Sequence, residues 1–162
     1  KSINLVKKNL KSKIPIMLKI SPEIEDSLIE KVSEIAINNS ISALILTNTS
    51  SVNRENLNGN KKNEEGGLSG KPIEKISNKI ISKFYKVLKG RIPIIGVGGV
   101  DSGQSIYKKV LAGASLVQLY TGMIYKGPQI VKNIKKEFIE KLKKDGVKNF
   151  TEIIGQGSLT KF

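Results

Sequence analysis

Apolar and polar residues alternate along this chain in blocks that have two different periods. Four short apolar runs, each too short for a helix and ended by small or polar residues, predict buried strands over 14–20, 43–46, 92–97 and 115–120. Helix-sized segments follow these runs, and apolar residues recur in them every three or four positions. Strand and helix therefore alternate four times, with one long polar loop over 52–65 that we expect to be mobile. This order predicts a parallel sheet whose strands are covered by helices.

The predicted helices are defined by their apolar stripes and by residues that favour helix ends. Ser21-Pro22-Glu23 predicts a helix start, because serine caps helices and proline suits their first turn. Residues 1–11 are expected to form the end of a helix, and 151–155 a short closing turn or helix. The three clearest stripes consist of Ile24, Leu28, Val32, Ile35 and Ala36; of Ile73, Ile76, Ile80, Phe84 and Val87, before a helix end at Gly90; and of Ile130, Ile134, Phe138 and Leu142.

Glycine-rich or small turns follow the last two predicted strands. Gly98-Gly99 comes after the strand 92–97, and Tyr120-Thr121-Gly122 ends the strand 115–120. Glycine lets the main chain approach an anion closely, and the N–H groups at a helix start attract negative charge. In eight-stranded α/β barrels the phosphate site usually lies at the loops after the last two strands. The pair of turns therefore predicts a phosphate site, although each turn alone is also typical of a simple strand-to-helix connection.

Two other segments carry candidate binding residues. Lys19 lies near the end of the first predicted strand, where a cation among apolar residues either faces a ligand or extends its amine to solvent. Residues 47–51 (Thr-Asn-Thr-Ser-Ser) follow the second strand and are either ligand donors and acceptors or a strand-end turn. Gly66-Gly67-Leu68-Ser69-Gly70, followed by Pro72, suits either an anion at a helix start or a flexible hinge.

Composition excludes several kinds of chemistry. The 162 residues contain no cysteine and no histidine, so disulfides, thiolate metal sites, a cysteine nucleophile and the commonest general base are absent from them, and we predict no metal site. The net charge of +14 is typical of proteins that bind nucleic acid or an anionic membrane. However, only Arg54 and Arg91 are arginines, and the lysines are interleaved with glutamates, which favours solvated helix faces and no nucleic-acid partner. No apolar run approaches the length of a membrane span.

Four motifs, in order, carry a family resemblance: LTNTS, EEGGLSGKP, IPIIGVGGVDSG and AGASLVQLYTGMIYKGP. Together they resemble the C-terminal half of the dihydroorotate dehydrogenases, and LVQLYT followed by YKGP is most similar to the class 2, quinone-linked, membrane-associated branch. The resemblance implies an α/β fold, the C-terminal half (four β/α units) of a TIM (β/α)8 barrel, over residues 1–162. A complete barrel takes about 250 residues, so we expect the chain to be cut from something longer.

The resemblance also implies roles for individual residues around FMN and orotate. Lys19 matches a lysine beside the pyrimidine end of the flavin ring, where a cation would stabilise the reduced flavin. The other expected cofactor-binding residues are Thr47, Ser69, Gly70, Gly98, Gly99, Tyr120 and Thr121, and the expected substrate-binding residues are Asn48 and Thr49. The implied reaction is the oxidation of dihydroorotate to orotate in de novo pyrimidine (UMP) biosynthesis, with a quinone as the electron acceptor.

Other features of the family have no counterpart here. The catalytic base of the class 2 branch is a serine on a loop of the N-terminal half, so we expect this chain alone to be inactive. The implied partners are dihydroorotate and orotate, a quinone, the missing N-terminal half, and a membrane surface reached through absent N-terminal helices. The implied location is peripheral on an inner membrane, on the cytoplasmic side if the source is bacterial. The segment 49–54 is one residue longer than usual, which leaves the role of Ser50 open.

Two alternatives to this interpretation remain open from the sequence. The first is a cytosolic class 1 dihydroorotate dehydrogenase with another electron acceptor. The second is a non-catalytic phosphate-binding module or a basic nucleic-acid module.

Overall fold

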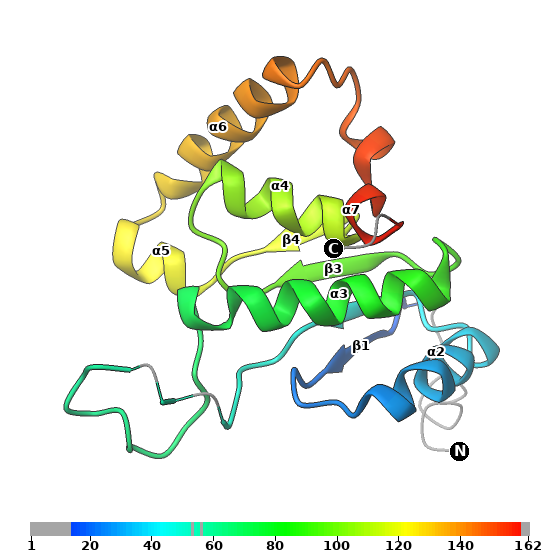
Figure 1. Ribbon diagram of the computed structural model, residues 1–162, viewed down its shortest axis with the longest axis horizontal. Coiled ribbons are helices and arrows are strands. Elements are labelled where there is room, and N and C mark those ends of the chain that lie inside the picture. Colours follow the sequence, from blue (N-terminus) through cyan, green and yellow to red (C-terminus); the bar gives the residue numbers. More distant parts are fainter. Residues whose placement is uncertain (1–13, 53, 56, 160–162) are drawn as a thin grey trace.

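The computed structural model describes residues 14–52, 54–55 and 57–159. Four strands, β1 (Met17–Ile20), β2 (Ala43–Leu46), β3 (Ile94–Val97) and β4 (Leu116–Gln118), form one parallel sheet in the order β1-β2-β3-β4 (Figure 1). This confirms the predicted direction and order of the strands. Three strands are shorter than the apolar runs that predicted them, and the helix expected over 1–11 lies outside the described residues.

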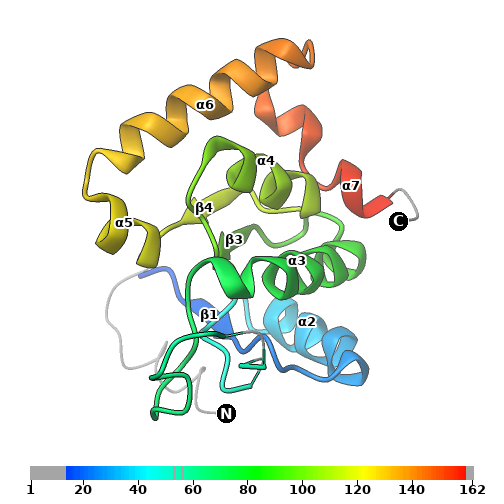
Figure 2. The same ribbon diagram turned by 60° about the vertical axis from the view of Figure 1, so that its left-hand side comes forward.

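Helices connect the strands and cover one face of the sheet (Figures 1 and 2). A core of apolar residues from β2, β3 and the first three α-helices lies between the two layers. The helical elements are η1 (Asp26–Leu28), α2 (Ile29–Asn38), η2 (Lys71–Ile73), α3 (Glu74–Leu88), α4 (Gly103–Ala112), α5 (Thr121–Lys126), α6 (Ile130–Lys144), η3 (Phe150–Ile153) and α7 (Gln156–Leu159).

The predicted start of the first helix at Ser21 is wrong. The hydroxyl of Ser21 donates a hydrogen bond to the carboxylate of Glu23, and α2 begins only at Ile29 after the turn of η1. Because the helix starts later than predicted, its buried face is partly different. Leu28 and Ile35 of the predicted stripe are 42% and 44% exposed, whereas Ile24, Val32 and Ala36 pack in the core as predicted. Ile29 and Ser33 are buried beside them.

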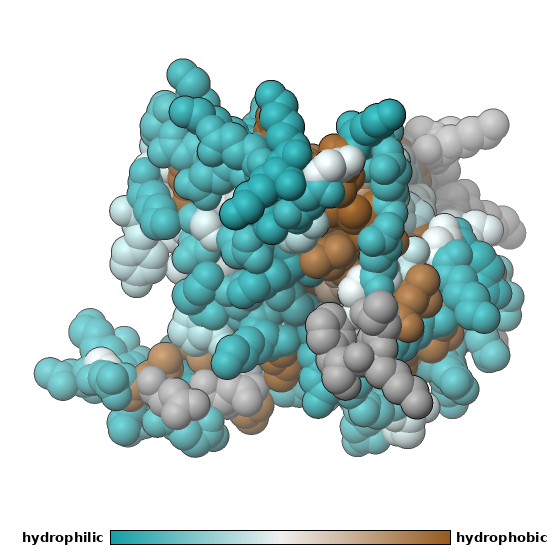
Figure 3. Space-filling view, turned by 45° about the horizontal axis from the view of Figure 1, so that its top comes forward, coloured by the Kyte–Doolittle hydropathy of each residue, from teal (hydrophilic) through white to brown (hydrophobic). Residues whose placement is uncertain are grey.

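The other two stripes are confirmed. Residues of the second stripe lie on the inner face of η2 and α3, and Leu88 ends α3, two residues before the predicted end at Gly90. Ile130 and Ile134 of α6 are buried against Ile106 of α4, while Phe138 and Leu142 pack with Tyr107 of α4. The expected closing element appears as η3 and α7. Hydrophilic residues cover most of the face drawn in Figure 3, as the interleaved charges predicted.

The opposite face of the sheet is only partly covered. Strand register aligns Lys19 of β1 with Ile45, Ile95 and Leu116 on this face. Met17 on β1 is 47% exposed and Leu116 on β4 is 61% exposed. The prediction that strands are buried on both faces therefore fails for β1 and β4, which are the edges of the four-stranded sheet.

The polar loop over 52–65 has no helix or strand among its described residues. The guanidinium of Arg54 donates hydrogen bonds to the carbonyls of Lys62, Glu64 and Gly66, so it ties the start of the loop to its end. The mobility of this loop stays a prediction. None of the helices within residues 14–159 that the structure describes is long and apolar enough to cross a bilayer.

Candidate functional site

A single pocket at the carboxyl ends of the four strands brings together all of the predicted site residues. Carboxyl ends of parallel strands meet at one edge of a sheet, so residues far apart in the sequence become neighbours there. Ile73, Val97, Val100, Leu119 and Gly122 complete the lining. The predicted residues in it are Lys19, Thr47, Asn48, Thr49, Ser69, Gly70, Gly98, Gly99, Tyr120 and Thr121.

The Gly98-Gly99 turn lies directly on the first turn of α3. Both glycines have positive φ angles, 108° and 74°, which side chains rarely adopt. A Cβ atom on Gly99 would lie 2.4 Å from Cβ and 2.7 Å from Cα of Glu74. The turn therefore requires glycine for both conformation and space, and it exposes main chain to the pocket.

The glycine-rich segment 66–70 is joined to two other parts of the pocket. Ser50 and Leu68 exchange backbone hydrogen bonds of 2.9 and 2.7 Å, which attach the segment to the turn after β2. Gly70, with φ of 77°, precedes η2, and a Cβ there would lie 2.8 Å from Cγ2 of Thr121. Thr121 in turn donates a hydrogen bond of 2.9 Å to the hydroxyl of Ser69. These contacts argue against a free hinge.

Thr47 is the most informative residue of the pocket. Its side chain is 2% exposed, yet its hydroxyl Oγ1 has no hydrogen-bond partner among the described residues. Leaving a buried hydroxyl unpaired costs about 1–3 kcal/mol. The backbone N–H of Thr47 donates to the carbonyl of Val97, so the residue is held in place by its main chain. Its hydroxyl is therefore an unsatisfied polar group in the wall of the pocket.

The remaining predicted polar residues lie at the mouth of the pocket. Lys19 is exposed on β1, so its amine reaches solvent while its side chain lines the pocket, and both sequence interpretations hold in part. Asn48 and Thr49 are exposed, and Tyr120 is 75% exposed. Ser50, whose role was open, is buried outside the pocket lining and donates to the carbonyl of Val52, as in a strand-end turn.

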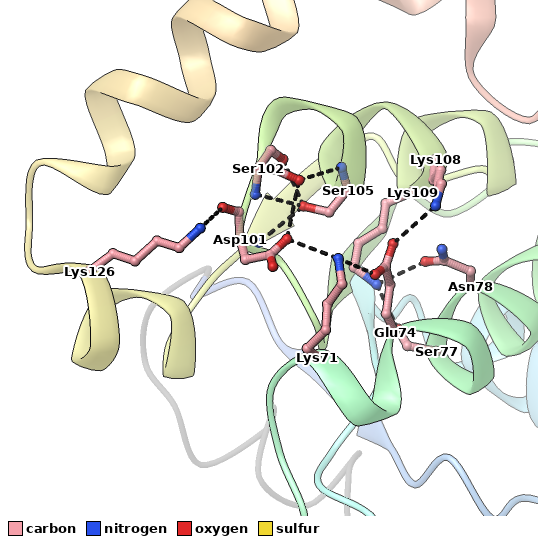
Figure 4. Close-up of polar contacts among 10 residues, drawn as sticks. All are labelled: Lys71, Glu74, Ser77, Asn78, Asp101, Ser102, Ser105, Lys108, Lys109 and Lys126. Carbon is pink, nitrogen blue, oxygen red and sulfur yellow. Dashed lines mark hydrogen bonds and ion pairs between the residues drawn. The ribbon is translucent and has the colours of Figure 1, made fainter.

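Sequence reasoning missed a network of charged residues around Glu74 and Asp101 (Figure 4). Lys71 forms ion pairs with Glu74 at 2.7 Å and Asp101 at 3.1 Å, and Lys126 donates to the backbone carbonyl of Asp101. The hydrogen bond to Glu74 raises the pKa of Lys71. Burial opposes ionisation of Asp101, but the hydrogen bond from Lys71 and its charge outweigh burial and lower the pKa of that carboxyl.

Lys109 of α4 is the other residue that sequence reasoning missed. It is fully buried, and its ammonium donates hydrogen bonds of 2.9 Å to Ser77 Oγ and to Asn78 Oδ1. Burial lowers the pKa of Lys109 to about 7. The available signal was its position four residues after Ser105 and three before Ala112, which puts it on the buried side of the helix.

Comparisons with known proteins agree with this arrangement. The family model described as dihydroorotate dehydrogenase matches residues 2–142. The quinone-type dihydroorotate dehydrogenase of Nautilia profundicola is 44% identical over 148 residues, which are 91% of this chain and 40% of that protein. The mitochondrial quinone-type enzyme of Arabidopsis thaliana is 40% identical over 142 residues, which are 87% of this chain and 31% of that protein.

Solved structures agree as well. A ligand-free dihydroorotate dehydrogenase from Eimeria tenella superposes with a TM-score of 0.85 at 36% identity, over 89% of this chain and 40% of that one. The same enzyme in complex with ferulenol gives a TM-score of 0.82 at 37% identity, over 86% of this chain and 37% of that one. The chain thus spans 31–40% of the length of these relatives. It is homologous to part of the quinone-type enzymes and belongs to the dihydroorotate dehydrogenase family.

Proposed function

We propose that this chain is the C-terminal half of an FMN-dependent, quinone-type dihydroorotate dehydrogenase, which oxidises dihydroorotate to orotate in de novo pyrimidine biosynthesis. The observation that carries the proposal is the buried, unpartnered hydroxyl of Thr47 in a pocket lined by every residue that the family motifs nominated. Family membership and quinone-type relatives support it further, and they favour it over a cytosolic class 1 enzyme.

The half-barrel assignment is supported by the sheet. Four parallel β/α units are half of an eight-unit barrel, and β1 and β4 have neighbours on one side only within the described sheet. Met17 and Leu116 on these edge strands are exposed, as apolar residues of a barrel interior would be if half of the barrel were taken away. The remaining strands would come from an N-terminal half that covers this face.

The residues of the pocket fit FMN. Gly70, Gly98 and Gly99 bring main chain close to the pocket, which suits a phosphate group, and Thr47 offers a hydroxyl without another partner. The pocket has a volume of about 140 Å³, smaller than typical small-molecule sites of about 300–1,000 Å³, so the other half would have to enclose the rest of the cofactor. When bound, FMN supplies the acceptor for the hydride of the substrate.

The side chains at the pocket mouth would bind and orient the substrate. Asn48 and Thr49 are exposed there and offer hydrogen-bond donors and acceptors for the orotate ring. Lys19 places a positive charge beside them. We assign no base to this chain, because the family resemblance implies that a serine of the N-terminal half removes the substrate proton.

The location and partners follow from the same assignment. Quinone reduction would take place at an inner membrane, on the cytoplasmic side in a bacterium, with attachment through N-terminal helices. The six lysines of α6 argue against a nucleic-acid partner, because they are interleaved with Glu137 and Glu140. The aromatic residue of this helix, Phe138, packs against Tyr107 and Phe150 and is not free to stack on bases.

The test uses protein expressed from the complete gene. We expect it to purify with flavin, released on denaturation as FMN, whose absorbance decreases when dihydroorotate is added without oxygen and returns with a quinone. Thr47→Val should weaken FMN binding about tenfold while leaving the ligand-free protein as stable or slightly more stable, because a methyl group replaces an unpaired hydroxyl. Thr47→Ser, which retains the hydroxyl, is the matched control. Protein that binds no flavin would overturn the proposal.

A further inference from the structure

Lys109 is a buried cation without a carboxylate of its own. No carboxylate among the described residues forms an ion pair with its ammonium, although a buried charge is normally paired. The aliphatic part of the Lys109 side chain crosses β3 at Gly96, which has no side chain. A Cβ on Gly96 would lie 3.2 Å from Cδ of Lys109. Figure 4 shows the ammonium pointing from α4 toward α3, on the inner side of the charged network.

A chain of two hydrogen bonds connects this ammonium to the predicted phosphate turn. The ammonium donates to Ser77 Oγ at 2.9 Å, and Ser77 Oγ donates to the carbonyl of Val97 at 2.6 Å. Val97 lines the pocket and immediately precedes Gly98-Gly99. A Cβ on Gly98 would lie 3.3 Å from Cβ of Ser77. The turn therefore packs against Ser77, the residue to which Lys109 donates its hydrogen bond.

The charged groups that face Lys109 leave it undercompensated. Glu74 of α3 raises its pKa, but burial is the larger effect, and Lys71 of η2 lowers the pKa further. The carboxylate of Glu74 already pairs with another lysine, because Oε2 lies 2.7 Å from Lys71, whereas Oε1 lies 3.8 Å from Lys108 of α4 and accepts no hydrogen bond among the described residues. Asp101, beyond them, is paired with Lys71. Burial therefore outweighs the carboxylate and lowers the pKa of Lys109 to about 7 in the ligand-free protein.

We propose that Lys109 is the buried countercharge of a phosphate group bound at the Gly98-Gly99 turn, and that it acts through the turn without touching the ligand. This inference rests on the proposed function, since it assigns the phosphate of FMN to that turn. A dianion there favours the protonated ammonium, so phosphate binding draws a proton onto Lys109. Affinity for a phosphate-bearing ligand should therefore fall as the pH rises above about 7.

The experiment compares FMN with riboflavin, which has the same ring and no phosphate. Protein from the complete gene is freed of flavin, and binding of both ligands is measured by flavin fluorescence at pH 7 and pH 9. The FMN phosphate stays dianionic over this interval. We expect FMN affinity to fall on the order of tenfold and riboflavin affinity to stay unchanged, because a shift of one pKa unit corresponds to a factor of ten.

Two variants separate charge from packing. Lys109→Met should lower FMN affinity at pH 7, remove its pH dependence and leave riboflavin binding unchanged. Lys86→Met is the matched control, because Lys86 is an exposed lysine of α3 and its loss should keep the pH dependence of the wild type. Equal loss of FMN and riboflavin in Lys109→Met would mean that Lys109 only holds α3 and α4 together, which would overturn the inference.

A measurement on the wild type avoids any dependence on a stable variant. Calorimetry at pH 7.5 in two buffers with different ionisation enthalpies should detect uptake of a substantial fraction of a proton with FMN and none with riboflavin. FMN binding without proton uptake and without pH dependence would overturn the role of Lys109 and leave the proposed function intact. Failure to bind either flavin would overturn both.

Discussion

The hydroxyl of Thr121 donates a 2.9 Å hydrogen bond to the hydroxyl of Ser69, although 52 residues separate them. Thr121 begins α5, and Ser69 lies in the glycine-rich segment before η2. The contact is possible because Gly70 has no side chain, since a Cβ there would lie 2.8 Å from Cγ2 of Thr121. Two loops that the sequence predicted separately as anion-binding turns are therefore one connected unit.

The first prediction concerns this pair. Ser69→Ala and Thr121→Val should each weaken FMN binding about three- to tenfold, because a lost hydrogen bond costs about 1 kcal/mol. The FMN affinity of the double variant should equal that of the single variant with the lower affinity, since each substitution removes the same hydrogen bond. Fluorescence titration measures the affinities, and Ser27→Ala, an exposed hydroxyl on η1, serves as the control. Fully additive losses would show that the two hydroxyls act independently.

The second prediction concerns Lys19. Lys19→Ala should weaken FMN binding or slow flavin reduction by tenfold or more, which corresponds to about 1.4 kcal/mol, because a positive charge at the pocket mouth is lost. Flavin content and stopped-flow reduction by dihydroorotate are the measurements. Lys31→Ala, an exposed lysine of α2, removes the same charge away from the pocket. The assigned role is wrong if both quantities match the wild type.

The third prediction concerns substrate binding. Asn48→Ala should raise the KM for dihydroorotate about five- to hundredfold with flavin content unchanged, since losing one polar contact to the substrate costs about 1–3 kcal/mol. Steady-state kinetics and the flavin absorbance of the same preparation provide both readouts. Loss of flavin with an unchanged KM would mean that Asn48 binds the cofactor and not the substrate.

Much of this fold could be predicted from local patterns. Short apolar runs located the four parallel strands along the chain, and the family resemblance nominated ten of the residues that line the pocket. Element ends were less predictable. The sequence Ser21-Pro22 is compatible with both a helix start and an isolated turn. In the structure the carboxylate of Glu23 accepts a hydrogen bond from the hydroxyl of Ser21, which stabilises the turn.

The charged network could not be predicted, because its members come from separate elements. Lys108 and Lys109 are adjacent in the sequence, and only tertiary packing exposes the first and buries the second. The buried position depends on the space above Gly96 and on acceptors from Ser77 and Asn78, which lie about thirty residues earlier. A sequence pattern on α4 contains none of this information.

The fourth prediction concerns stability and pH. The pKa of Lys109 is about 7 in the folded protein and about 10.4 when unfolded, so between these values the unfolded state binds more protons. The free energy of unfolding of the ligand-free protein should therefore rise with pH in this interval, by at most about 1.4 kcal/mol per pH unit from this group. Denaturant unfolding at pH 7, 8 and 9 tests it.

Lys109→Met isolates this contribution. Its stability relative to the wild type should be greatest near pH 7 and should decrease toward pH 10, because only the wild type loses a buried charge over that range. A stability difference that stays constant with pH would contradict the low pKa of Lys109.

The last prediction is that this 162-residue chain alone, even with FMN added, does not oxidise dihydroorotate. Met17 on β1 and Leu116 on β4 are exposed, and both strands are edges of the described sheet, so the isolated chain should self-associate. Co-expression with the N-terminal half of a quinone-type relative should supply strands, a closed flavin pocket and the serine base. Dihydroorotate-dependent loss of flavin absorbance, measured for the chain alone and for the pair, distinguishes the two cases. Bleaching by the chain alone would sink the half-barrel proposal, because it would show that the substrate proton is removed without the N-terminal half.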